Sequence, residues 1–150
     1  MEEDVTATTA SGCTFCAIIA GTLPASVVLK DEAVVAFLDI NPVGPGHVLV
    51  VPRVHCLGVS DMPVETGLRL WAVAHRVAGG LKAAFPQTEG INLWLAEGEV
   101  AHQSVPHAHL HVIPRRSGDG LKITEEPRTP PTRGDLDAAA KSLRQWLDHG

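Results

Sequence analysis

The chain has 150 residues and a net charge of −5, from 12 Lys and Arg against 17 Asp and Glu. This length suits one domain and is too short for two full ones, and 45% hydrophobic residues exclude disorder of the whole chain. A mildly acidic chain without Tyr has no broad basic face and few rings on which bases could stack. We therefore expect no nucleic-acid partner.

The cysteine count and the N-terminal composition bear on the compartment. An odd number of cysteines, with Cys13 and Cys16 paired and Cys56 alone, is untypical of a secreted disulfide framework and indicates a reducing environment. The uncharged residues 5–29 follow an acidic start and are interrupted by Thr, Ser, Gly and Pro, unlike a signal peptide or a membrane-spanning helix. We expect a cytoplasmic protein with no membrane partner.

The first half of the chain predicts mostly short elements. Residues 1–11 are small and polar and predict a mobile tail. The elements expected after it are a short helix, a hairpin of two β-branched runs, a rigid loop rich in Pro and Gly, and a strand. In that order they occupy residues 15–20, 26–30 with 33–39, 41–46, and 47–52.

The second half contains the one long helix. Apolar residues at helical spacing after Pro63 predict a helix over residues 63–85, with a stripe that holds Val64, Leu68, Trp71, His75, Ala78 and Lys82. Strands over 91–96 and 107–113 follow, then an arm over 115–133 and a final helix, capped by Asp135, through Leu147. This order predicts an α+β fold with a five-stranded antiparallel sheet, a core over 12–114 and a C-terminal arm with a short helix over 115–150.

Three histidines alternate with apolar residues in the segment 107–113. In a strand, His107, His109 and His111 would project from one face, with neighbouring imidazoles about 6.6 Å apart. Such a row suits a ligand with several oxygens, such as a phosphate chain, because one imidazole can attack phosphorus while others stabilise charge. A His-x-His metal site and a plain polar surface remain alternatives.

The chain resembles the histidine triad (HIT) family, in the zinc-containing nucleotide-binding branch. The resemblance rests on the alternating histidines and on four further segments in the same order, residues 13–16, 36–42, 46–52 and 103–106. It implies hydrolysis of a nucleoside phosphoramidate or a related nucleotide, with purine as the expected base. It also implies a homodimer whose sheets join edge to edge.

The resemblance also implies roles for single residues. His109 would attack the α-phosphate and form a transient nucleotidyl-histidine. The phosphate and the leaving group would be contacted by His111, His47 and Ser104. The nucleoside would be bound by Asp39, at the ribose, and by Gln103, Phe15, Ile18, Phe37 and Ile40. From the residues alone, Asp39 is also compatible with a turn cap, Phe37 and Ile40 with plain core, and Ser104 with a loop hydroxyl.

The Cys13-x-x-Cys16 pair is compatible with redox chemistry or with half of a metal site. It precedes the first expected strand, which favours metal. The resemblance adds His55 and His107 as the other two ligands of a closed, structural zinc site. Cys56 is read as an apolar core residue.

The chain departs from the family pattern at two positions. Glu97 stands before Gly98 where relatives usually have Asn, and His102 stands where they usually have Gly. The missing amide could lower the rate. Two alternatives to a phosphoramidase therefore stay open: a dinucleoside polyphosphate hydrolase, which the Cys pair disfavours, and a nucleotide-binding regulatory module with little turnover.

Overall fold

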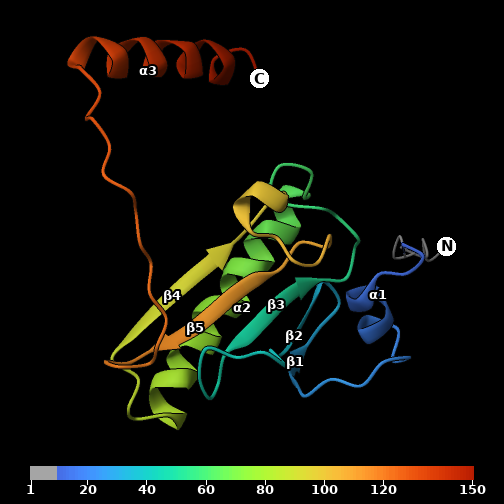
Figure 1. Cartoon of the computed structure of the whole chain (residues 1–150). Coiled ribbons are helices and arrows are strands. Elements are labelled where there is room, and N and C mark those ends of the chain that lie inside the picture. Colours follow the sequence, from blue (N-terminus) through green and yellow to red (C-terminus); the bar gives the residue numbers. More distant parts are fainter. Residues whose placement is uncertain (1–9) are drawn as a thin grey trace, which may run out of the picture.

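The structure is a computed structural model that describes residues 10–150, so most of the predicted tail lies outside the described residues. Three α-helices, one 3-10 turn and five strands follow one another along these residues (Figure 1). They are α1 (Thr14–Ile19), β1 (Val27–Lys30), β2 (Val34–Leu38), β3 (Val48–Pro52), α2 (Val64–Ala84), β4 (Gly90–Leu95), η1 (Glu99–Ala101), β5 (Leu110–Arg115) and α3 (Arg133–Leu147).

The five strands form one sheet in the order β1-β2-β3-β5-β4, and every neighbouring pair is antiparallel. This confirms the predicted α+β fold and its five-stranded antiparallel sheet. Between β2 and β3 the register runs without a break from Val34↔Pro52 to Leu38↔Val48. Strands far apart in sequence, β3 and β5, are therefore neighbours at the centre.

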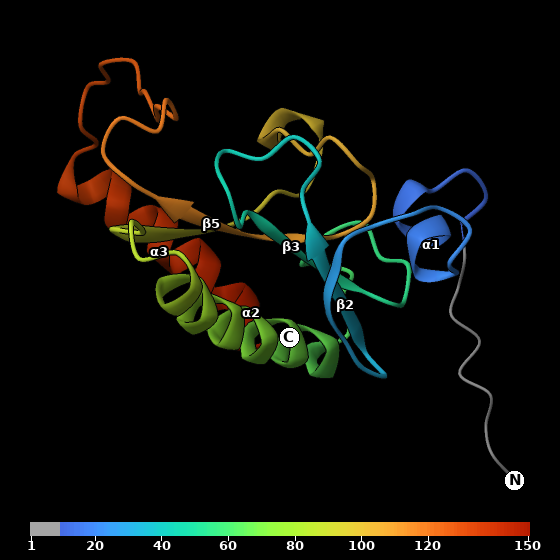
Figure 2. The same cartoon turned by 90° about the horizontal axis from the view of Figure 1, so that it is seen from below.

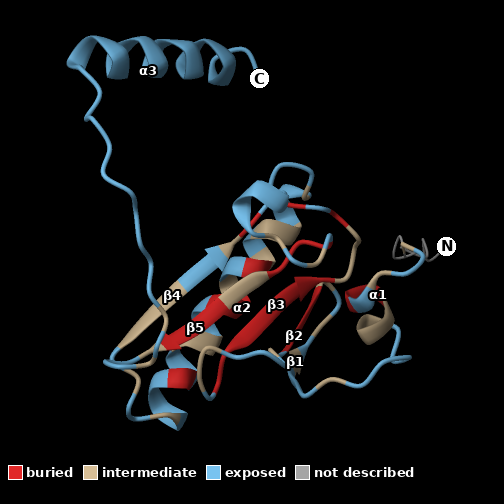
Figure 3. Cartoon of the chain, in the orientation of Figure 1, coloured by how far each residue is buried: buried red, intermediate tan, exposed pale blue. Residues whose placement is uncertain are grey.

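Both faces of β2 and β3 are covered, because alternate side chains point to opposite sides. Val34, Ala36, Val48 and Val50 pack against α2, which lies along one face of the sheet (Figures 2 and 3). On the other face lies a second buried cluster, which includes α1: Phe15, Val35, Phe37, Leu49 and Val51. His111 of β5, which is paired with Leu49, lies on this second face.

The long helix has its expected bounds, with Pro63 and Phe85 as its flanking residues. The stripe predicted from helical spacing is, however, mostly its outer face: the side chains of Leu68 and Trp71 are 65% and 60% exposed. The face that packs on the sheet carries Leu70, Val73, Ala74 and Leu81. Small and branched side chains allow the helix to approach the sheet closely, where an indole does not fit.

After β5 the chain runs as an extended arm to α3, which stands apart from the sheet and is exposed along its length (Figures 1 and 3). Asp135 is not the cap of α3, as predicted, but its third residue. The N-cap is Thr132, whose hydroxyl accepts the Asp135 N–H at 3.1 Å, while the Asp135 carboxylate accepts the Thr132 N–H at 2.9 Å. The reciprocal pair is a capping box.

Within residues 10–150, no helix combines the length and hydrophobicity that crossing a bilayer requires.

The loop before β3 depends on Gly46. Its φ is +89°, in the region that favours glycine, and a Cβ there would lie 2.7 Å from a methyl carbon of Leu81 and 2.9 Å from the Phe85 ring. The absent side chain therefore lets the loop lie against the end of α2.

We expect Gly46→Ala to lower the free energy of unfolding by about 1–3 kcal/mol, because it combines backbone strain with overpacking. Urea denaturation of the purified variant measures this. Gly44→Ala is the matched control in the same loop, since nothing lies within 4 Å of its added Cβ. Equal destabilisation by the two substitutions would contradict this interpretation.

Candidate active site and metal site

The strand predicted over residues 107–113 begins later than expected, at Leu110. Pairing with β3 ends at Val50↔Leu110, and two residues further along β3 stands Pro52, which has no N–H to donate. The Ala108 N–H donates instead to the Cys56 carbonyl at 2.7 Å. His107 and His109 therefore lie on the segment that precedes β5, where the backbone hydrogen bonds differ from those of the sheet.

His109 is held in one tautomer. Its Nδ1 lies 2.7 Å from the His107 carbonyl oxygen, which can only accept, so Nδ1 carries the proton and Nε2 has a lone pair. The ring is 3% exposed and meets the Phe15 ring edge to face at 5.1 Å. Burial lowers the pKa of His109, against the opposing effect of its hydrogen bond to the His107 carbonyl. The arrangement leaves a neutral, nucleophilic nitrogen in a nearly dry site.

His47 and His111 form a hydrogen-bonded pair beside Asp39. The Val43 N–H donates to His47 Nδ1 at 3.0 Å, so His47 Nε2 carries the proton and donates to His111 Nδ1 at 2.9 Å. His111 must then present its own Nε2–H on the other side of the ring. Asp39 Oδ2 lies 3.5 Å from His47 Nε2 and 3.8 Å from His111 Nδ1.

Burial keeps this pair neutral. It lowers the pKa of His47, against the raising effect of Asp39, and lowers that of His111 to about 4, assisted by the neighbouring His109 and His47. At neutral pH, His111 therefore offers a polarised N–H rather than a full positive charge.

A cavity of about 310 Å³ lies beside these histidines, between α1 and the ends of β2 and β3. It brings together most of the predicted nucleotide-site residues: Phe15, Ile18, Phe37, Asp39, Ile40, Ser104, His109 and His111. Phe15 and Phe37 are both core residues and cavity walls, with their rings edge to face at 5.5 Å. Ile40 is 91% exposed and forms only the rim.

Gln103 lies next to this cavity in sequence, but its amide is used within the protein. Its Oε1 accepts the Gly98 N–H at 2.8 Å, and its Nε2–H donates to the Leu57 carbonyl at 2.6 Å. The side chain therefore clamps two loops together, and its predicted nucleotide contact stays a prediction. Ser104, the following residue, is exposed and has its hydroxyl at the cavity.

Glu97, the first departure from the family pattern, also points into the protein's own loops. Its carboxylate accepts the Ser60 N–H at 3.0 Å and is also bonded by the Ser60 hydroxyl. These hydrogen bonds lower the pKa of Glu97, so the group is a carboxylate at neutral pH. It lines neither of the two cavities at the histidines.

A second cavity, of about 520 Å³, lies on the other side of His111 and Ser104. Its floor is β4 and β5, with Asn92, Trp94 and Ile113, and its outer wall is the arm, residues 121–124. Arg115 anchors the arm, since its guanidinium donates to Asp119, to Asn92 and to the Leu121 carbonyl. Nothing in the arm's local sequence pattern points to a site, and its part in the cavity was not predicted.

Four predicted metal ligands meet at the start of α1. The ligand atoms of Cys13, Cys16, His55 and His107 all lie within 4.8 Å of one another. His107 Nδ1 is 3.4 Å from Cys13 Sγ, 3.5 Å from Cys16 Sγ and 3.2 Å from His55 Nδ1, and Cys16 Sγ is 3.4 Å from His55 Nδ1. A tetrahedral zinc ion needs about 3.3 Å between two nitrogens and about 3.6 Å between nitrogen and sulfur. The four residues fit such an ion.

The outer hydrogen bonds of the cluster agree with a metal. His107 Nε2 donates to the Pro52 carbonyl at 2.8 Å, which leaves Nδ1 unprotonated toward the cluster. Burial raises the pKa of the Cys16 thiol, as does the neighbouring Cys13 sulfur. Two thiolates at this position would therefore be unfavourable unless a bound cation balanced their charge. Cys56 is buried but is not among these ligand atoms, and burial, followed by Asp61, raises its pKa to about 11.

Comparison with known proteins places this geometry in context. The family model for the HIT domain matches residues 20–118. The chain is 34% identical over 141 residues to "Adenosine 5'-monophosphoramidase HNT1" of Saccharomyces cerevisiae, covering 94% of this chain and 84% of that protein.

Solved structures agree in fold. A HIT family protein from Bacillus anthracis has a TM-score of 0.85 at 37% identity, over 91% of this chain and 98% of that one. A zinc-bound histidine triad family protein from Mycobacterium smegmatis has a TM-score of 0.70 at 36% identity, over 92% and 96% of the two chains. Family model, sequence and structure coincide on the segment that carries the three histidines, and the chain belongs to the HIT domain family.

Proposed function

We propose that this protein hydrolyses a nucleoside phosphoramidate, or a related purine nucleotide, at its α-phosphate. The observation that carries the proposal is His109: a buried, neutral imidazole whose bare Nε2 borders a cavity large enough for a nucleoside. A relative named as an adenosine monophosphoramidase, 34% identical over 94% of this chain, supports the substrate class.

In this mechanism His109 Nε2 forms a bond to phosphorus as the bond to the leaving group breaks, and water then releases the nucleotide from the histidine. Two displacements replace one difficult step. His111 Nε2–H donates to a non-bridging oxygen, and His47 acts through His111 by fixing its tautomer. The hydrogen bond from His109 Nδ1 to the His107 carbonyl stabilises the positive charge that develops on the attacking ring.

The nucleoside would occupy the cavity between Phe15 and the end of β2. Asp39 keeps acceptor capacity for ribose hydroxyls, although its Oδ1 already takes the Asn41 N–H at 2.8 Å. The walls around a base are apolar, from Phe15, Ile18 and Phe37. Apolar walls with few polar groups are typical of a small-molecule site.

We expect His109→Ala to lower turnover of adenosine phosphoramidate by about 10³-fold or more, because the covalent route is lost. Binding of adenosine monophosphate should persist, since Asp39, Phe37 and His47 are intact. Single-turnover hydrolysis and calorimetric binding, measured on the same preparations, test both points, and His149→Ala serves as the control for removal of a distant imidazole.

Other results would contradict the mechanism. Turnover of the Ala variant near the wild-type rate would mean that another group attacks. Parallel loss of binding and turnover would mean that His109 is only a phosphate contact. Wild-type protein that binds nucleotide without turnover would favour the regulatory module, and preference for a dinucleoside polyphosphate would favour that hydrolase.

The Cys13, Cys16, His55 and His107 cluster is proposed to hold a structural zinc ion. Closed four-residue sites of this composition leave no position for substrate. When bound, the metal would add ligand bonds between α1 and the sheet, and so would stabilise the wall that Phe15 gives to the nucleotide cavity. A zinc-bound relative supports the identity of the ion.

We expect about one zinc ion per chain in protein never exposed to chelator, and its loss in Cys16→Ser together with a lower melting temperature. Elemental analysis and thermal denaturation measure the two effects. Cys56→Ser is the matched control, because it removes a buried thiol outside the cluster and should keep the metal. Wild-type protein purified without metal would refute the assignment.

The protein is proposed to be a homodimer with α2 and the edge strand β4 at the two-fold axis. In a single chain, Val64, Leu68 and Trp71 form an apolar stripe on the outer face of α2. Trp94 on β4 is 43% exposed beside an unpaired strand edge. Exposed apolar surface of this kind marks association sites.

We expect Trp71→Glu to convert a dimer into a folded monomer, because a carboxylate would be buried without a partner. Sedimentation velocity across a range of concentrations reports the state. Val28→Glu, on β1 at the opposite edge of the sheet, should leave the dimer intact. A wild-type monomer at every concentration would show that the stripe is not an interface.

A further inference from the structure

His102 has a backbone conformation that its residue type rarely adopts. Its φ of 66° and ψ of 32° lie in the left-handed region, and it is the only residue other than glycine with positive φ within residues 10–150. Glycine adopts this region at no steric cost, whereas a residue with a Cβ is strained there. Residues in this region cluster at active sites and ligand clamps, and histidine, with Asn and Asp, tolerates it better than most other residues do.

The surrounding loop holds His102 in place. The His102 N–H donates to the Glu99 carbonyl at 2.9 Å, and the Ala101 N–H donates to the Gly98 carbonyl at 3.1 Å. The amide of Gln103 then ties this turn to the Leu57 loop. His102 is therefore presented from a fixed backbone, with its side chain at the surface.

The side chain borders the second cavity, which also contains His111 and Ser104. These last two residues line the nucleotide cavity as well, whereas His109 lines only that one. A phosphorus atom held at His111 and Ser104 would thus have the nucleophile on one side and the second cavity on the other. In-line displacement sends the leaving group away from the nucleophile, and so into the cavity that His102 borders.

Departure of an amine from phosphorus requires a proton, because an amide anion is too basic to leave at neutral pH. His111 and His47 cannot supply it, since burial lowers the pKa of both and keeps them neutral. His102 is an exposed imidazole in the cavity where the leaving nitrogen would lie. Imidazole exchanges protons with water readily near neutral pH.

We propose that His102 is the general acid that protonates the leaving amine. The inference rests on the proposed function. As His109 Nε2 bonds to phosphorus and the P–N bond breaks, the His102 imidazolium transfers its proton to the departing nitrogen, which leaves as a neutral amine. In the second step the neutral His102 takes the proton of the attacking water, so the protons balance over one cycle.

Two substrates with the same nucleoside distinguish proton donation by His102 to the leaving group from any other role of this side chain. One is an adenosine phosphoramidate of a primary alkylamine, which must be protonated to leave. The other is the para-nitrophenyl ester of adenosine monophosphate, whose leaving anion is stable without a proton. We expect His102→Gly and His102→Asn to lower the single-turnover rate of leaving-group release about 10²-fold for the amine and to change that rate less than about threefold for the ester. The first step is measured because hydrolysis of the nucleotidyl-histidine is common to both substrates.

His102→Gly relieves the backbone strain and His102→Asn suits the left-handed region, so both variants should fold. Added imidazole should restore turnover of the amine substrate in His102→Gly, and His149→Gly should behave as wild type.

Equal losses on both substrates, or no loss on either, would overturn the assignment of His102. The result is distinguishable from failure of the proposed function. If wild-type protein hydrolyses both substrates through a trapped nucleotidyl-His109 while the His102 variants do not discriminate, only this inference fails. If wild-type protein hydrolyses neither, the proposed function fails, and the role of His102 fails with it.

Discussion

The position of His107 constrains both the metal cluster and the histidines at the nucleotide cavity. Its imidazole is fully buried, with Nε2–H bonded to the Pro52 carbonyl at the end of β3 and Nδ1 directed at the two cysteines and His55. Its own carbonyl accepts the proton of His109 Nδ1. One residue thus joins the sheet, the metal cluster and the tautomer of the nucleophile, so a change at the cysteines can reach His109 through a single hydrogen bond.

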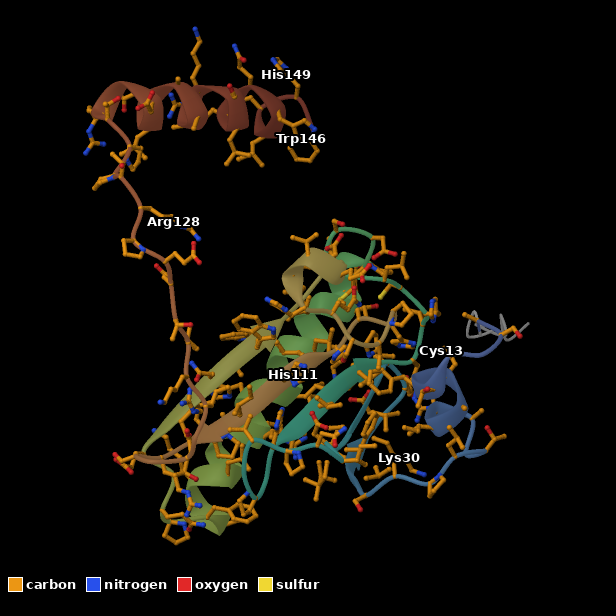
Figure 4. All side chains as sticks on the ribbon, viewed as in Figure 1. Cys13, Lys30, His111, Arg128, Trp146 and His149 are labelled. Carbon is orange, nitrogen blue, oxygen red and sulfur yellow. The ribbon has the colours of Figure 1, made fainter. Side chains whose placement is uncertain are left out.

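The division of the sheet into two faces separates stability from chemistry. One face of β2 and β3 packs on α2 and supplies the larger core. The other carries α1, the histidines and both cavities. Figure 4 shows His111 over the middle of the sheet, whereas Trp146 lies on the distant α3 and His149 just beyond the end of that helix. Because neighbouring residues of one strand serve both faces, a one-residue shift in register would move the histidines into the core.

The departures from the family pattern have different structural consequences. Glu97 is withdrawn into a hydrogen-bonded pair with Ser60, and its negative charge is kept from the phosphate site. His102, in contrast, is presented at a cavity that adjoins the phosphate histidines. A carboxylate near phosphate would repel it, whereas an imidazole can carry a proton to it, which accounts for the opposite placement of the two side chains.

Local patterns in the sequence determined the five strands and the bounds of α2, because strand alternation and helix periodicity are short-range properties. The residues expected at the metal cluster and at the nucleotide cavity were instead implied by the resemblance to the HIT family. Tertiary structure decided what depends on distant partners. The start of β5 depends on the position of Pro52 in β3. The hydrogen bonds of Gln103 and Glu97 depend on the loop at residues 57–60. The outer wall of the second cavity depends on the arm that Arg115 anchors. The outward stripe of α2 was likewise chosen by packing, since both sides of the helix are apolar in sequence and only the side with Val73 and Ala74 fits the sheet.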